Sequence, residues 1–189
     1  MGCSPRPSCK PARPKKGADL KSLMRLYRRH NRPDAMRESE FFRTMPSLSL
    51  AIHHAALAID HRDKRFSHQR RQQRPALERA KQSLVATARE LKACIQFDEL
   101  HALIERTIHS IGGLRELYTY DTALRIGAFL GLAPEFVYLH RGTRAGARAL
   151  GLNAKLPYLT VDQLPAELRT LSPAEVEDFL CIYKDYFAT

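Results

Sequence analysis

Apolar residues recur every three or four positions through most of this 189-residue chain. The clearest case lies in residues 77–95, where the apolar positions are Leu77, Ala80, Leu84, Ala88, Leu91 and Ile95. This spacing puts them on one face of a helix of about 20 residues. No series of alternating apolar and polar residues indicates strands. The pattern therefore predicts a mainly α fold, built as a single compact multi-helix domain.

Composition divides the chain into a tail and a helical domain. Residues 1–17 contain four prolines and five Lys or Arg residues, with nothing apolar enough to form a core, so we expect a disordered basic tail. Residues 18–189 form the predicted domain, with basic helices in 18–96 and a core rich in helix–turn–helix units in 97–189. Asp19 is the expected cap of the first helix, and "SPAE" at 172–175 is a capping box that opens the last.

Charge is unevenly distributed along the chain. The formal net charge is +11, but Lys and Arg outnumber Asp and Glu by 22 to 8 in residues 1–96 and are outnumbered by 12 to 9 in residues 97–189. This asymmetry favours an anionic partner for the first half, either nucleic acid or an anionic membrane surface. A basic tail that only aids solubility is the simpler alternative. We expect nucleic acid, with DNA favoured over RNA.

One basic segment stands out at residues 62–74, "RDKRFSHQRRQQR". Six of its 13 residues are cationic, and Arg suits bidentate contact with phosphate. Phe66 could stack on a base, and Gln69, Gln72 and Gln73 could bond base edges. A surface loop without a ligand would show the same composition. The predicted phosphate contacts of this segment are Arg62, Lys64, Arg65, Arg70, Arg71 and Arg74.

A glycine pair separates two helical patterns in "LHALIERTIHSIGGL…YTYDTALRIGAFLG", within residues 100–131. This arrangement resembles the helix-hairpin-helix motif of nucleic-acid-binding proteins. The resemblance implies that Gly112 and Gly113 form a phosphate-facing turn, whose backbone N–H groups would meet the nucleic acid. The chain departs from the motif because its glycines are adjacent and "LRELYTYD" separates them from a second helix expected to begin near 119–121. A helix C-cap without a ligand is the alternative.

Three further arginines lie in "HRGTRAGARALG", residues 140–151. Arg141, Arg144 and Arg148 recur at helical intervals beside loosely spaced glycines, so we add them to the predicted nucleic-acid-binding residues. The segment lacks the Gly-Lys-Ser/Thr ending of a phosphate-binding P-loop and the GxGxxG pattern of a dinucleotide site. Its small residues could instead allow close helix packing.

A second function class is an enzyme acting on a phosphorylated or nucleotide substrate. Tyr120, Asp121, Arg125 and His140 are the candidate catalytic residues, because His with Asp suits proton transfer and Arg with Tyr suits phosphate. Asp121 and Arg125 are four residues apart and could pair on one helix face. A structural role at the edge of the core is the alternative. This reading requires the four side chains to converge in one pocket.

The remaining motifs add few functional indications. The Cys and His spacing matches no metal motif, so we expect neither metal nor cofactor. No apolar run is long enough to span a membrane, and no secretory signal is visible, which favours a cytoplasmic protein. Gly2 and Cys3 resemble an acylation start, although Arg6 stands where Ser or Thr is required. The glycine-turn stretch also resembles segments of uncharacterised bacterial proteins, and a bacterial effector or protein-interaction module is the third reading.

Overall fold

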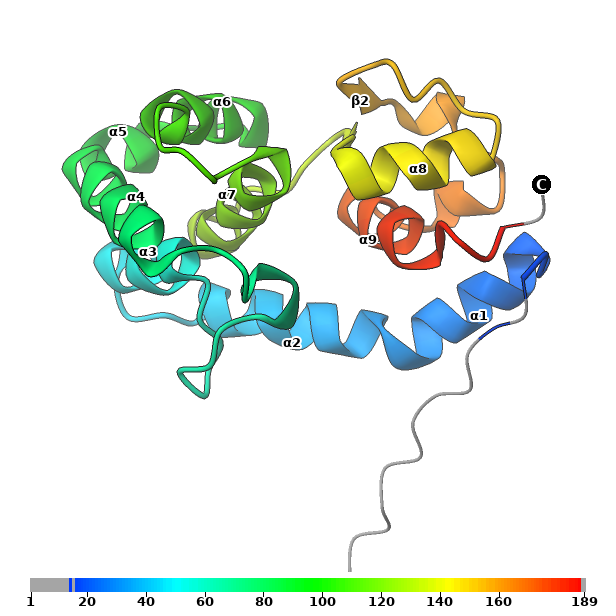
Figure 1. The fold of residues 1–189 in the computed structure, drawn as a ribbon, viewed down its shortest axis with the longest axis horizontal. Coiled ribbons are helices and arrows are strands. Elements are labelled where there is room, and N and C mark those ends of the chain that lie inside the picture. The colour runs from blue at the N-terminus through cyan, green and yellow to red at the C-terminus, as the bar shows by residue number, and fades with distance from the viewer. Residues whose placement is uncertain (1–13, 15, 188–189) are drawn as a thin grey trace, which may run out of the picture.

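The computed structural model describes residue 14 and residues 16–187 and is mainly helical, as the apolar spacing predicts (Figure 1). None of the described helices has the length and hydropathy needed to cross a bilayer. The predictions for most of the tail, and for Gly2 and Cys3, lie outside the described residues. The described elements are α1 (Leu20–His30), α2 (Arg32–Arg43), α3 (Leu48–Leu57), α4 (Arg74–Ala86), α5 (Ala88–Ala93), α6 (Phe97–Ile108), α7 (Glu116–Leu130), β1 (Val137–Tyr138), α8 (Arg141–Ala149), β2 (Tyr158–Leu159) and α9 (Pro173–Tyr183).

The predicted helix caps at both sequence extremes of the domain are confirmed. Asp19 accepts a hydrogen bond of 2.9 Å from the backbone N–H of Ser22 and so caps α1. Ser172 and Glu175 form a reciprocal capping box at the start of α9, with Pro173 in its first turn. These side chains satisfy donors that the first turn of a helix otherwise leaves unpaired.

The single helix expected over residues 77–95 is instead two helices. The break falls at Thr87, whose backbone leaves the helical region and whose hydroxyl donates to the carbonyls of Ser83 and Leu84. Leu91 is still buried, but Ile95 lies beyond α5 and is 76% exposed. A hydroxyl that bonds the preceding turn weakens a helix at that point, and apolar spacing alone does not register this competition.

The connection between α6 and α7 is shorter than the sequence suggests. α7 begins at Glu116, so most of "LRELYTYD" forms its first two turns, and Tyr118 and Tyr120 are buried within it. The expected start near 119–121 is therefore wrong. Gly113 has a φ of +91°, which L side chains rarely adopt, and it turns the chain between the two helices.

The buried apolar side chains of the domain form two clusters. One extends from Phe42, near the end of α2, to Ile126 of α7, and we call this part the first lobe. The other joins Leu23–Tyr27 of α1 with Val137–Phe187, and we call it the second lobe. Figure 1 shows the two lobes side by side, with α1 and α2 running along one edge beneath both.

The second lobe is organised around the packing of α8 on α9. A Cβ placed on Gly146 would lie 2.3 Å from the carbonyl oxygen of Leu180, so only glycine permits this approach of the two helices. β1 pairs antiparallel with β2 and matches Val137 with Leu159. The small residues of 140–151 thus serve close helix packing, which was one of the two readings of that segment.

Candidate functional site

The basic segment and the glycine turn lie next to each other. Arg71, Gln72 and Gln73 precede α4, and together with Ala76 they line a hollow of about 300 Å³ whose other wall is Gly112 and Gly113. We call this the basic hollow. Both glycines are exposed, and a Cβ on either would meet no atom within 4 Å. Their backbone is therefore open to a ligand approaching from outside.

The cations of the basic segment differ in their exposure and in whether they pair with an acidic group. Lys64, Arg70 and Arg71 are exposed and have no acidic partner within residues 16–187. Arg62 is 2.8 Å from the Asp60 carboxylate. Arg74 lies 3.8 Å from Glu78, and the half-buried Arg65 donates to the carbonyl of Gln72. Lys64, Arg70 and Arg71 are thus the cations of this segment best able to contact an anionic partner.

Two side chains expected to contact bases are occupied inside the protein. The Phe66 ring lies under the Arg125 guanidinium, 3.9 Å from it, and forms a cation–π contact. Gln69 is buried, and its amide bonds both Asp121 and Arg125. Gln69 is therefore not free to bond a base edge, and Arg125 already covers one face of the Phe66 ring. Gln72 and Gln73 remain at the basic hollow.

The three arginines of α8 do not line the basic hollow. Arg144 donates to the carbonyls of Ala154 and Leu156 and lies 3.6 Å from Glu116, so its guanidinium is used within the fold. Arg141 and Arg148 are exposed on α8 in the second lobe. The sequence grouped them with the glycine turn, but the structure does not bring them to the same hollow.

Asp121 and Arg125 belong to one polar network, although they do not pair with each other as expected. Asp121 accepts from His68 at 2.9 Å and from Gln69 at 2.7 Å. Arg125 donates to Glu38 at 2.7 Å and to Gln69 at 2.9 Å. The hydrogen bond to Asp121 raises the pKa of His68. Gln69 thus bridges the two charged groups and ties the basic segment to α7.

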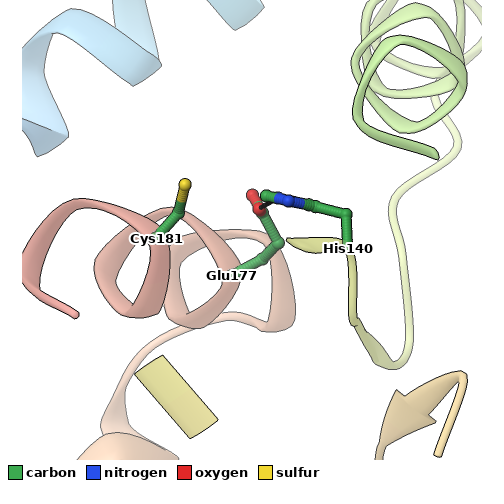
Figure 2. A group of neighbouring side chains, drawn as sticks. All are labelled: His140, Glu177 and Cys181. Atoms are coloured by element: carbon green, nitrogen blue, oxygen red, sulfur yellow. Dashed lines mark hydrogen bonds and ion pairs between the residues drawn. The ribbon is translucent and has the colours of Figure 1, made fainter. Parts of the chain in front are cut away.

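His140 and Tyr120 are both buried and do not belong to this polar network. The ring of His140 faces Glu177 of α9, and Figure 2 shows the imidazole directed at that carboxylate. Thr143 donates to the same carboxylate oxygen at 3.1 Å. His140 Nδ1 accepts from the N–H of Gly142 and caps α8, so Nε2 carries the proton that Glu177 accepts. Burial raises the pKa of Glu177, and its hydrogen bond to His140 opposes that effect.

A large cleft of about 1270 Å³ separates the two lobes, and we call it the interlobe cleft. Its walls are α2, residues 60–70, α7 and α9. Asp121 and Arg125 line it, whereas Tyr120 and His140 do not. The four catalytic candidates therefore do not converge in one pocket, which weakens the enzyme reading. Sequence reasoning missed Glu177 and the adjacent Asp178, both of which line the cleft; an acidic pair inside the apolar pattern of the last helix was the available signal.

A trio of potential metal ligands also comes together here, although no sequence spacing indicated it. The ligand atoms of His140, Glu177 and Cys181 lie within 4.8 Å of one another (Figure 2). In the ion-free protein these groups already bond one another, because Glu177 accepts hydrogen bonds from His140 and Thr143. Burial and the nearby Glu177 also raise the pKa of the Cys181 thiol to about 12, so it stays protonated. The trio is a packed polar contact between β1, α8 and α9.

Comparison of the chain with protein-family models, with curated proteins and with solved structures finds no match. The resemblance of residues 100–131 to a helix-hairpin-helix motif therefore stays a prediction. The functional indications come from the basic hollow and from the interlobe cleft.

Proposed function

We propose that the protein binds nucleic acid at the basic hollow. The observation that carries the proposal is the contact between two features singled out separately in the sequence, the basic segment and the Gly112–Gly113 turn, which line one hollow. Two unrelated signals separated by some 40 positions meet at one exposed surface. A basic surface segment without a ligand would not need to lie beside the glycine turn.

Each group at the basic hollow has a distinct task in this proposal. The exposed cation Arg71 lines the hollow, and Lys64 and Arg70 of the same basic segment lie along the interlobe cleft. All three attract and hold phosphates. The open backbone of Gly112 and Gly113 lets a phosphate approach the turn closely. The side-chain amides of Gln72 and Gln73 can bond base edges, which the major groove of DNA presents and the deep, narrow groove of duplex RNA does not. We therefore propose DNA as the preferred form.

The first test measures the salt dependence of binding to a short DNA duplex by fluorescence anisotropy, with an RNA duplex in parallel. The variant replaces Lys64, Arg70 and Arg71 with Gln. A matched control removes the same charge from exposed positions of the second lobe, Lys21, Arg29 and Lys155. If each cation contacts a phosphate, the slope of log affinity against log salt falls by about 3 in the first variant. Equal losses in both variants, or no DNA binding at low salt, would refute the proposal.

The second test separates backbone approach from charge. Gly112→Leu adds bulk at the turn without altering charge, and its Cβ has open space around it, so the fold should tolerate it. Because a side chain there blocks a phosphate from the backbone, we expect about tenfold weaker DNA binding with an unchanged melting temperature. Unchanged affinity would remove the glycine turn from the binding surface.

A further inference from the structure

Helix α1 carries a row of exposed cations along one of its faces. We call this set the cationic face of α1; its members are Lys21, Arg25, Arg28 and Arg29. Their spacing of i, i+4, i+7 and i+8 places all four on the same side of the helix. The other side is buried, because Leu23, Met24 and Tyr27 belong to the core of the second lobe. The apolar and the charged sides of α1 are therefore separate.

The cationic face of α1 differs from the neighbouring helix α2 in lacking counter-charges. Every cation of α2 forms an ion pair: Arg32 with Glu175, Arg37 with Asp34, and Arg43 with Glu40. In the described part of the chain, the four cations of α1 form no ion pair with a carboxylate. Arg25 and Arg28 donate to hydroxyl groups, those of Ser22 and Thr170. The charge of α1 is thus left for a partner outside the chain.

The cationic face of α1 also continues a basic run of the sequence. Residues 10–29 contain eight Lys or Arg residues and one acidic residue, Asp19. Asp19 caps α1 and lies near Arg25, so its charge offsets the cations at the start of the helix and not along its length. A cluster of about four to eight Lys or Arg residues on an amphipathic helix is typical of surfaces that recognise anionic lipid headgroups.

The position of α1 favours a flat partner over a nucleic acid. Figure 1 shows α1 at the outer edge of the molecule, beneath the second lobe. None of its four exposed cations lines the basic hollow or the interlobe cleft. The exposed residues of α1 include no amide or aromatic side chain that could bond or stack on a base. A row of charges at an outer edge, without a hollow, suits contact with a plane of headgroups.

Packing fixes the orientation of α1 within the second lobe. The N–H of Ala18 donates to the carbonyl of Tyr186 at 3.1 Å, just before the helix begins. Within the helix, Tyr27 packs edge-on against Phe179 of α9. Because its apolar side is held in this core, α1 cannot insert that side into a bilayer. Contact through α1 would be electrostatic and would weaken as salt screens the charges.

We propose that the cationic face of α1 docks the protein on a bilayer surface rich in anionic phospholipid. The guanidinium and ammonium groups lie against the headgroup phosphates and carboxylates, while α1 keeps its packing on the second lobe. This surface is separate from the basic hollow, so membrane docking and DNA binding can be lost independently.

The test measures co-sedimentation of the full chain with vesicles of phosphatidylcholine, either alone or mixed with phosphatidylserine. Binding is expected to the mixed vesicles only, and high salt should abolish it. The variant replaces Lys21, Arg25 and Arg29 with Gln and keeps Arg28, which bonds Thr170. One cation near an anionic surface contributes about fivefold in affinity, so this variant should bind about 100-fold more weakly.

Two control variants separate the position of the charge from its amount and type. Replacing Arg79, Arg89 and Lys92 with Gln removes the same charge from exposed positions of α4 and α5 and should weaken vesicle binding only about threefold. Replacing Arg25 and Arg29 with Lys retains the charge and should leave binding unchanged. Melting temperatures should agree among the three variants, because all the substituted side chains are exposed.

Several results would contradict membrane docking through α1. No binding to the mixed vesicles would overturn it, as would equal losses in the α1 variant and the α4–α5 control. Loss of binding in the Lys variant would show that surface charge is not what the bilayer recognises. If DNA affinity fell further in the α1 variant than in the α4–α5 control, this face would belong to nucleic acid instead.

Discussion

Three cations of the basic segment, Lys64, Arg70 and Arg71, are exposed and unpaired, whereas the buried charges on the α7 and α9 walls of the interlobe cleft are held by other groups of the chain. Within residues 16–187 the side chains of these three residues form no ion pair with a carboxylate. Arg125 is 3% exposed and is held by Glu38, Gln69 and the Phe66 ring. The two regions are joined through Gln69, since one segment supplies both the free cations and the buried bridge.

This difference separates two uses of charge. A solvated, unpaired cation adds little to stability and stays available to a partner. A buried pair fixes its two elements together, and removing one member leaves the other charge without compensation. Substitutions of the two kinds should therefore have opposite signatures, with changes in binding at the exposed cations and changes in folding at the buried, partnered charges.

The largest expected effect is at the buried pair of His140 and Glu177. His140→Ala leaves the Glu177 carboxylate buried without its ring partner and should lower the free energy of unfolding by about 4 kcal/mol at pH 8. The loss should become smaller as the pH is lowered, because burial raises the pKa of Glu177 and its carboxylate takes up a proton more readily. Urea unfolding at pH 8 and at lower pH measures this. His109→Ala, at an exposed histidine, is the matched control and should cost under about 0.5 kcal/mol.

The next expected effect is a gain in stability instead of a loss. The pKa of Asp178 rises from 3.8 to about 7 on folding, so the folded state binds this proton more tightly, and stability falls as pH rises from about 4 to 7. Asp178→Asn removes the penalty and should stabilise the protein by about 2 to 3 kcal/mol at pH 8, with no gain near pH 4. Melting temperatures across this range test it. Destabilisation at pH 8 would show that the contact between Asp178 and the Tyr27 hydroxyl outweighs the cost of burying the charge.

A smaller effect is expected at the turn. Gly113→Ala places a Cβ at a φ of +91° and should cost about 1 kcal/mol. Gly112→Ala, one residue earlier, lacks this constraint and should be close to neutral. Thermal unfolding of the two variants compares them. Equal costs would indicate that the turn has a different backbone conformation in solution.

The smallest effect on folding is expected from the exposed cations. Replacing Lys64, Arg70 and Arg71 with Gln should change the free energy of unfolding by under about 0.5 kcal/mol in total, while DNA affinity falls. Urea unfolding of the triple variant checks the first half of this statement. A large loss of stability would mean that these cations are paired in solution. They would then not differ from the buried, partnered charges.

Local features of the fold could be predicted from the sequence, and long-range ones could not. Apolar spacing and capping residues act within one or two turns, which is why the caps at Asp19 and Ser172 were predicted correctly. The break at Thr87 was missed because it depends on a side-chain bond that competes with the helix. The pairing of Asp121 with His68, 53 residues away, depends on how α7 packs against a loop, and no local pattern encodes it.

For the candidate sites, the sequence indicated which residues are unusual but not which groups they contact. The sequence identified Asp121, Arg125 and His140 as unusual, and each makes specific polar contacts. It assigned them to one another, while the structure gives each a different partner. Side-chain chemistry is written in the sequence, but the acceptor that each donor finds is decided by tertiary packing.

The contact between α1 and α9 has a consequence for the order in which the protein can assemble during synthesis. Tyr183 donates to Asn31 across 152 residues, and Tyr27 packs edge-on against Phe179. A ribosome releases the first-lobe segments, Phe42 to Ile126, well before α9 exists. The first lobe can thus fold before synthesis is complete, while the apolar face of α1 is still exposed to solvent. The core of the second lobe can form only after α9 has been synthesised.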